Sequence, residues 1–168
     1  MMCFSPDTLI STTTGSKPIG EVQPGEFVNA FDFGRGEWVP AEVLERHNNV
    51  YSGQMVSLVV GEARIEVTAK HPFGVIEGEK LTQRQHPGHL QTGEDQGRSI
   101  PGRWVDSHEL QVGDVLVGRD GRPHQVQRVA IRDAQQAPVC NLTIRDHHSF
   151  AVSDESVLVH NFGLVYEP

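Results

Sequence analysis

The sequence lacks three features, and each absence narrows the class of function. It has no run of Lys or Arg, and its net charge is -8, so we expect no nucleic-acid partner. It has no apolar run as long as a membrane span, so we expect no membrane partner. The first residues show neither the charged segment nor the apolar stretch of a signal peptide, so we expect no leader there.

Cysteine and helical periodicity are also scarce. The 168 residues include two cysteines, Cys3 and Cys140, which is too few to indicate a disulfide framework. Short runs of Val, Ile and Leu are separated by 17 glycines and 10 prolines. This composition predicts an all-β domain of short strands joined by turns, and the length is sufficient for one domain with a sizeable core.

Two distant segments of the sequence match each other. Residues 21–28 (EVQPGEFV) and 109–116 (ELQVGDVL) share the order Glu, apolar, Gln, any residue, Gly, acid, apolar, apolar. A glycine-containing turn and a second strand follow each of them. Strands are expected at residues 8–12, 38–44, 55–60, 64–68, 124–131, 139–144 and 157–159. The duplication predicts a compact body of two β subdomains related by pseudo-two-fold symmetry.

A polar segment separates the two copies. Residues 77–103 contain few apolar side chains and many Gly, Gln, Glu and Ser, which is typical of an exposed insertion. His86 and His89 could ligate a metal, but no Cys or acid completes a tight cluster beside them. We therefore interpret the segment as a solvated loop and expect no bound metal.

The chain's last apolar strand leads directly into His160 and Asn161. The side-chain amide of an Asn can attack its own carbonyl carbon, close a succinimide and expel the next residue. A neighbouring imidazole can assist by polarising the carbonyl or by protonating the leaving amine. On its own a His-Asn pair before a tail is also compatible with an ordinary turn.

Both copies end on a His-x-Phe sequence. The first copy ends with Thr68 and His71 in a Thr-x-x-His pattern, and the second ends with His148. Each can also be read structurally, the first as a turn at a strand end and His148 as a buried, hydrogen-bonded core residue. His147 would point to the opposite face from His148 if this segment were a strand.

Together these motifs resemble those of the Hint superfamily, which includes inteins and hedgehog autoprocessing domains. The resemblance covers residues 3–161 and is most like bacterial intein-like domains, including the pretoxin type. Four motifs occur in the family's order, and the joint order is specific where each motif alone is common. They are Cys3 followed by Asp7-Thr8, the Thr68-x-x-His71 block, Asn141-Leu142-Thr143 leading to His148, and His160-Asn161.

The resemblance implies a self-processing activity that turns over once and needs no cofactor. Cys3 would attack the preceding carbonyl and convert the amide into a thioester, because a thiolate is a much better nucleophile than a hydroxyl. His71 would protonate the leaving nitrogen, and Thr68 would orient His71 or bind the oxyanion. His160 and His148 would assist cyclisation of Asn161. Covalently attached flanking segments would be the partners of a monomer.

Two positions depart from the family pattern. Many inteins carry an acidic residue where this chain has Asn141, which leaves the coupling of the two steps open. Splicing inteins place Cys, Ser or Thr after the terminal Asn, whereas Phe162 has no side-chain nucleophile. Cleavage is therefore expected to dominate over splicing. Cys140 is open to two interpretations, a small apolar core residue or a redox partner of Cys3.

We accordingly expect one domain, residues 1–168, with an autoprocessing unit at 3–161 and flanking remnants at 1–2 and 162–168. The resemblance implies a bacterial source and a secreted host protein, while the residues leave the compartment open. Two other functions remain: a cysteine hydrolase that acts in trans, and a degenerate, non-catalytic linker module. The position of Cys3 at a junction argues against the first, and the presence of all the motif residues argues against the second.

Overall fold

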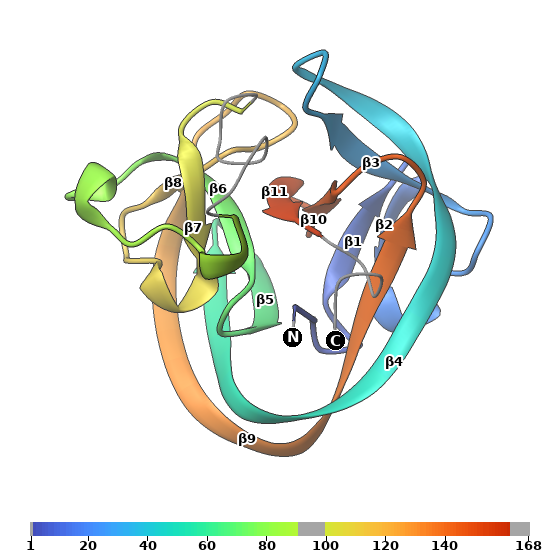
Figure 1. Ribbon diagram of the computed structural model, residues 1–168, viewed down its shortest axis with the longest axis horizontal. Helices are drawn as coiled ribbons and strands as arrows, with labels where there is room; N and C mark the ends of the chain where they lie inside the picture. Colours follow the sequence, from blue (N-terminus) through green and yellow to red (C-terminus); the bar gives the residue numbers. More distant parts are fainter. Residues whose placement is uncertain (1, 91–99, 162–168) are drawn as a thin grey trace.

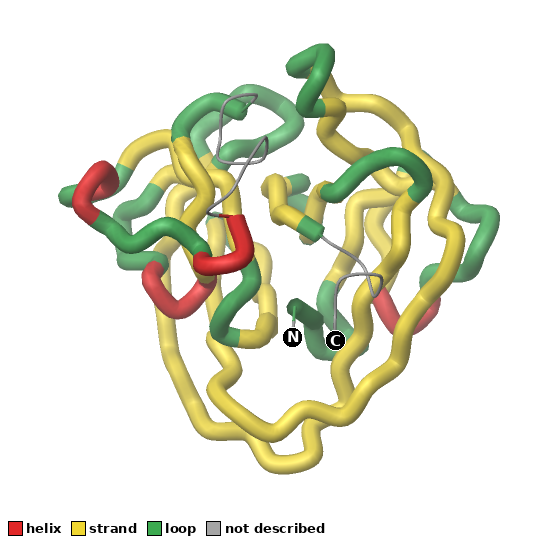
Figure 2. Tube along the Cα trace, in the orientation of Figure 1, coloured by secondary structure: helices red, strands yellow, loops and turns green. Residues whose placement is uncertain are grey.

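The computed structural model describes residues 2–90 and 100–161. Within these residues it contains eleven β-strands and four short 3-10 helices, with no α-helix (Figures 1 and 2), which confirms the all-β prediction. No helix in this part of the chain is long and apolar enough to cross a membrane. The strands are β1 (Leu9–Thr12), β2 (Gly15–Pro18), β3 (Phe27–Asp32), β4 (Glu37–Val60), β5 (Ala63–Thr68), β6 (Pro72–Glu77), β7 (Arg103–Asp106), β8 (Val115–Leu116), β9 (His124–Ile144), β10 (Ser149–Val152) and β11 (Val157–His160). The 3-10 helices are η1 (Ile19–Glu21), η2 (Leu81–Gln83), η3 (Gly88–Leu90) and η4 (Ser107–Glu109).

Strands β4 and β9 are much longer than the sequence indicated. Four expected strands, two in each copy, merge into two, because the polar residues between them stay extended and pair with each other. The antiparallel pairing of β4 and β9 runs from Val43 opposite Ile144 to Val60 opposite Val126, with register shifts on the way. The two strands form the curved frame that encloses the rest of the molecule in Figure 1.

The predicted duplication is visible in the backbone hydrogen bonds. In the first copy the N–H of Gly25 donates to the carbonyl of Val43 at 2.8 Å, and in the second the N–H of Gly113 donates to Val126 at 2.8 Å. Both glycines have left-handed φ angles, 92° and 98°, a conformation that a residue with a Cβ adopts at a cost. The matched sequences therefore form matched turns, each holding its copy to one of the long strands.

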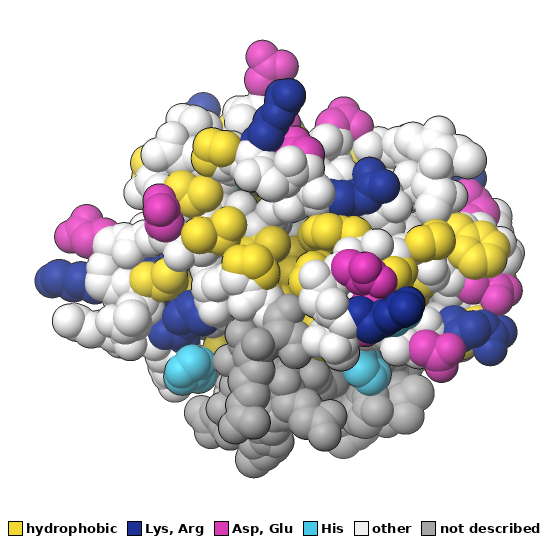
Figure 3. All heavy atoms as spheres, turned by 90° about the horizontal axis from the view of Figure 1, so that it is seen from above, with side chains coloured by type: hydrophobic (Ala, Val, Ile, Leu, Met, Phe, Trp, Pro, Cys, Tyr) yellow, Lys and Arg dark blue, Asp and Glu magenta, His cyan; other side chains and the backbone are white. Residues whose placement is uncertain are grey.

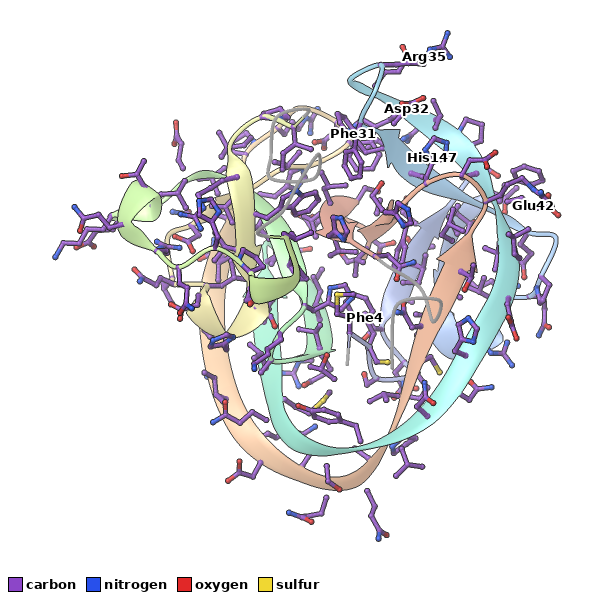
Figure 4. All side chains as sticks on the ribbon, viewed as in Figure 1. Phe4, Phe31, Asp32, Arg35, Glu42 and His147 are labelled. Carbon is purple, nitrogen blue, oxygen red and sulfur yellow. The ribbon has the colours of Figure 1, made fainter. Side chains whose placement is uncertain are left out.

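The core lies between the two copies, where short strands from both meet. Strands β10, β11 and β6 are consecutive in the sheet, and β10 also pairs with β1. Phe4, Phe73 and Phe150 are completely buried at this junction, and Phe4 points into the centre of the molecule (Figure 4). Phe4, near the start of the described residues, is thus held in the core by apolar packing.

Residues 77–103 are less exposed than expected, in the part that the structure describes. Arg84 is buried and donates to both carboxylate oxygens of Asp114, at 2.6 and 2.8 Å. Leu90 and Ile100 pack into an apolar cluster with Trp104. The segment is polar in composition, but an ion pair and a few apolar side chains hold it to the second copy. Residues 91–99 lie outside the described residues.

Candidate active site

Cys3 and Thr68 are joined through their backbones and the threonine side chain. The N–H of Cys3 donates to Oγ1 of Thr68 at 3.1 Å, and the N–H of Thr68 donates to the carbonyl of Cys3 at 3.0 Å. Both side chains are buried, and so is Met2, the residue before Cys3. Thr68 ends β5, which pairs with β4. The threonine hydroxyl therefore contacts the nitrogen of the Met2–Cys3 peptide bond.

The ring of His71 lies beside this pair, between aromatic residues. It is completely buried, with its centroid 4.5 Å from that of Phe4 and 6.2 Å from that of Phe73. Phe4 follows Cys3 and Phe73 lies at the start of β6, so chain connectivity brings both rings to the histidine. Thr68 thus contacts Cys3, and His71 packs against the residue that follows Cys3.

An apolar wall surrounds Cys3 on another side. Cys3 clusters with Met55, Ala134 and Val139, and the partly buried Tyr51 packs against this group. Burial raises the pKa of the Tyr51 hydroxyl, and the nearby Cys3 adds to this shift. The sequence analysis did not identify this wall, because Tyr51, Ala134 and Ala137 lie outside the expected strands.

A second group of candidate residues lies at the end of β11. His160 and Asn161 are buried, and the N–H of Asn161 donates to the carbonyl of His148 at 2.7 Å. The rings of His148 and His160 are stacked, with centroids 6.4 Å apart and planes within 6°. The side-chain Nδ2 of Asn161 donates to the carbonyl of Leu142 at 2.6 Å, which fixes the position of this amide.

One local expectation around His148 is wrong. Residues 145–148 form a turn before β10, not a strand, and Asp146 has a φ angle of 63°. The alternation that would send His147 to the opposite face therefore does not apply. His148 is partly exposed, so the interpretation of it as a fully buried core histidine is also not supported.

Two aromatic residues that the sequence analysis did not select hold His160. The ring of Phe33 stacks on it at a centroid distance of 6.0 Å and 11° between planes. The ring of Trp104 meets it edge to face at 5.1 Å and 87°. Phe33 lies in the turn after β3, where Asp32 Oδ1 accepts the N–H groups of Gly34 and Arg35. No sequence signal links this turn to β11, since only the fold brings them together.

This aromatic packing continues to the surface at an open groove of about 630 Å³. The groove belongs to the upper side of the molecule in Figure 1, near the turn between β3 and β4. Figure 3 shows that side, with hydrophobic side chains gathered across its middle. Its apolar lining includes Phe31, Phe33, Trp38, Ile100 and Pro101. The packing around His160 therefore extends from the interior to solvent.

The two candidate groups are linked through strands that they share. Phe73 of β6 pairs with Val159 of β11, so the strand that follows His71 lies beside the strand that ends at His160. A bridge between Phe4 and Cys140 places Cys3 alongside Asn141, whose neighbour Leu142 accepts the bond from Asn161. Residues 141–142 of β9 thus contact both ends of the chain.

Cys140 belongs to the main apolar core and not to the cluster around Cys3. Its Sγ lies 3.2 Å from Oδ1 of Asn48, and burial raises the pKa of its thiol. No disulfide joins it to Cys3. These contacts support the interpretation as a small core residue.

No group of three or more His, Cys, Asp or Glu side chains is arranged to hold a metal ion within residues 2–90 and 100–161. His86 lies in a pocket with Lys70, Asp106, His108 and Glu109. Asp106 there is buried, and this burial raises its pKa to about 6. The side chain of His89 is outside the described part.

Comparison with known proteins agrees with this geometry. A family model of the pretoxin Hint domain matches residues 90–162. The solution structure of a bacterial intein-like domain from Clostridium thermocellum superposes with a TM-score of 0.74 at 27% identity, covering 96% of this chain and 99% of that one. The chain has the Hint fold. It is similar to the pretoxin Hint domain over residues 90–162 and to a bacterial intein-like domain over nearly its whole length.

More distant structures share the same fold. The DnaB intein from Synechocystis sp. PCC 6803 matches with a TM-score of 0.64 at 18% identity, covering 96% of this Hint domain and 99% of the intein. The gp41-1 intein matches with a TM-score of 0.59 at 16% identity, with coverages of 96% and 99%. Comparison with curated proteins gives no match. The Hint fold supports a self-processing, intein-like function in general terms.

A buried histidine anchors the turn that leads into β11 of this Hint domain. His124 lies with Nε2 2.6 Å from Asp120 Oδ1 and Nδ1 3.0 Å from Glu155 Oε1. Burial lowers the pKa of His124, but the bonds to Asp120 and Glu155 outweigh it, so its pKa is raised. A Cβ on Gly118 would lie 2.2 Å from this ring, so glycine is required there. The cationic ring thus holds the β10–β11 turn.

We expect His124→Gln to lower the free energy of unfolding more at about pH 5.5 than at about pH 8.5. The folded-state pKa is raised, so the stabilisation is complete below the unfolded pKa and is lost as pH rises through the folded pKa. Urea unfolding of both proteins across this range measures the effect. His86→Gln, at an exposed histidine, is the control. An equal loss at every pH would contradict a charged His124.

Proposed function

We propose that this Hint domain breaks the peptide bonds at its own two junctions. The observation that carries the proposal is the hydrogen bond from the N–H of Cys3 to Thr68 Oγ1. The nitrogen of the Met2–Cys3 bond, which must leave when that bond breaks, is thereby held next to Thr68, and the ring of His71 lies against Phe4, the residue after Cys3.

In the first step the Cys3 thiolate attacks the carbonyl carbon of Met2. The C–N bond breaks, the nitrogen becomes a free amine by gaining a proton, and a thioester forms at Cys3. His71 is the proton donor in this proposal, since its ring lies against Phe4, the residue after Cys3. The hydrogen bond places Thr68 on the nitrogen side of the bond, so its role is to orient the leaving amide. The apolar wall around Cys3 slows hydrolysis of the thioester but does not prevent it.

In the second step Nδ2 of Asn161 attacks its own carbonyl carbon and gives up one of its two protons, which balances the proton that the leaving amine gains. The bond to Phe162 breaks, the amine of Phe162 gains a proton and a succinimide remains at Asn161. The donor, in this proposal, is His160, which is oriented by Phe33 and Trp104, while His148 holds the backbone N–H of Asn161. The bond from Nδ2 to Leu142 fixes the nucleophile before the attack.

The outcome follows from Phe162, whose benzyl side chain cannot accept an acyl group. The thioester at Cys3 is left to water or to an added thiol, so cleavage at both junctions is the main result. A minor ligated product forms where the released amine of Phe162 attacks the thioester before the fragments separate. The proposed unit is a monomer of residues 3–161 that acts once on its covalently attached flanks.

The domain placed between two foreign folded proteins tests this proposal. Intact-mass measurement over time should show loss of each partner separately, and dithiothreitol should accelerate release at Cys3. An unchanged mass would indicate the degenerate linker module. Repeated turnover of an unrelated peptide would indicate the cysteine hydrolase acting in trans.

A further inference from the structure

The 3-10 helix η4 is hydrogen-bonded to the turn of residues 68–71. The hydroxyl of Ser107 in η4 donates to the carbonyl of Thr68 at 2.5 Å and lies 3.4 Å from the N–H of His71. The N–H of Ser107 donates to the carbonyl of His71 at 2.9 Å. Ser107 is completely buried. One residue therefore bonds to the backbone of both Thr68 and His71.

The next residue adds to the same contact. The N–H of His108 donates to the carbonyl of Ala69 at 3.0 Å, and its ring Nδ1 lies 2.6 Å from the same oxygen. From the opposite side, the N–H of Ala69 donates to the carbonyl of Gln54 at 3.2 Å. The Thr-x-x-His turn is thus held between η4 and β4, with polar bonds on both sides.

The duplicated copy provides an internal comparison. There η1 contacts the segment before β1 in the same way: the N–H of Ile19 donates to the carbonyl of Thr8 at 2.8 Å, and that of Gly20 to Pro6 at 3.0 Å. The backbone bonds therefore belong to the shared fold. Ile19 and Gly20, however, offer no side-chain hydrogen bond. The additional bonds from Ser107 and His108 occur at η4, which holds the turn that carries His71, and have no equivalent at η1.

We propose that Ser107, assisted by His108, is a positioning residue that sets the geometry of Thr68 and His71 for the step at Cys3. The inference rests on the proposed function, because Thr68 and His71 need a fixed geometry for catalysis only if they take part in the step at Cys3. Ser107 touches no reacting atom. It acts by bonding to the carbonyl groups of Thr68 and His71 and to the N–H of His71. Thr68 in turn contacts Cys3, and His71 contacts Phe4.

Ser107→Ala in the fusion protein tests the proposal. Thiol-induced release at Cys3 should slow by roughly 10- to 100-fold, the scale expected for a small misplacement of a catalytic group. Release at Asn161 should change little, because bonds to Leu142 and to the carbonyl of His148 hold Asn161 in place. Ser107→Thr keeps the hydroxyl and should recover most of the lost rate.

Ser149→Ala is the matched control. Ser149 is also completely buried, accepts a bond from the N–H of Phe31 at 2.8 Å and donates to the Phe31 carbonyl at 3.0 Å. Ser149→Ala should lower thermal stability about as much as Ser107→Ala does, without slowing release at Cys3. Equal slowing by both alanine variants, or no slowing by Ser107→Ala, would show that Ser107 is only structural.

A readout without cleavage separates this inference from the proposed function. NMR spectra of the unaltered domain and of Ser107→Ala are compared. The variant should show shifted ring signals of His71 and faster hydrogen exchange at the His71 amide. Unchanged His71 signals would overturn the inference. If the unaltered protein cleaves at neither junction, the proposed function fails, and the NMR comparison still decides whether Ser107 holds the turn.

Discussion

Replacing Cys3 with Ala is expected to abolish release of an N-terminal partner, with or without dithiothreitol. The methyl group of alanine cannot attack the Met2 carbonyl, and the nearby hydroxyls of Thr68 and Tyr51 are much weaker nucleophiles than a thiolate. Intact-mass analysis of the fusion protein measures the loss. Cys140→Ala is the matched control, since Cys140 is the other buried cysteine and belongs to the main core.

In His71→Ala, the rate of release at Cys3 should fall by about 10²- to 10⁴-fold, the usual scale for losing a general acid. The expelled nitrogen would then leave without a positioned proton donor. His86→Ala, at an exposed histidine, should leave the rate unaltered. Cleavage at Cys3 that persists in the Cys3→Ala protein would refute the thioester step, while an unaffected His71→Ala protein would refute only the role of His71.

Replacing Asn161 with Ala is expected to block release of the C-terminal segment and to leave thiol-induced release at Cys3 intact. Only an amide side chain can close the succinimide, whereas Cys3, Thr68 and His71 do not require it. Mass analysis of both fragments distinguishes the two junctions. Asn29→Ala is the control, because Asn29 is also a buried asparagine whose Nδ2 donates to Ser11 and Thr12.

Phe162→Cys should raise the ligated fraction, because a thiol after Asn161 can accept the acyl group from Cys3. The comparison with the unaltered protein isolates the effect of this one side chain. Efficient ligation by the unaltered protein, with little of either single-cleavage product, would contradict the proposed dominance of cleavage.

The predicted strands are all present, but the apolar strands β6 and β10 and the polar middle sections of β4 and β9 were missed. The hairpin of β4 and β5 follows from the apolar content of residues 55–60 and 64–68. The middle sections of β4 and β9 are polar, and nothing local marks them as strands. They are extended because each finds hydrogen-bonding partners in the other, and such pairing between distant segments is invisible in a single stretch of sequence.

The candidate site divides in a similar way. Cys3, Thr68, His71, His148, His160 and Asn161 were selected from motif order, and the structure places them in two groups on linked strands. Their chemical roles remain predictions that the experiments above test. Phe33, Trp104 and Ser107 carry no motif, because an aromatic residue in a turn or a serine before a histidine is common in any sequence.

The sequence alone indicated the all-β class and the chemistry that we propose for this domain. The repeated Glu-x-Gln-x-Gly pattern predicted the duplication, and Phe162 restricts how the proposed reaction can end. These properties depend on residue type and on order along the chain.

The tertiary structure alone decided which atoms meet. It placed Thr68 Oγ1 on the nitrogen of Cys3, stacked Phe33 on His160, and inserted Ser107 between Thr68 and His71. Each of these contacts joins residues from different strands or turns. Their distances depend on how β4 and β9 curve around the core, because a bond a few ångströms long is set by the packing of the whole sheet and not by any local pattern.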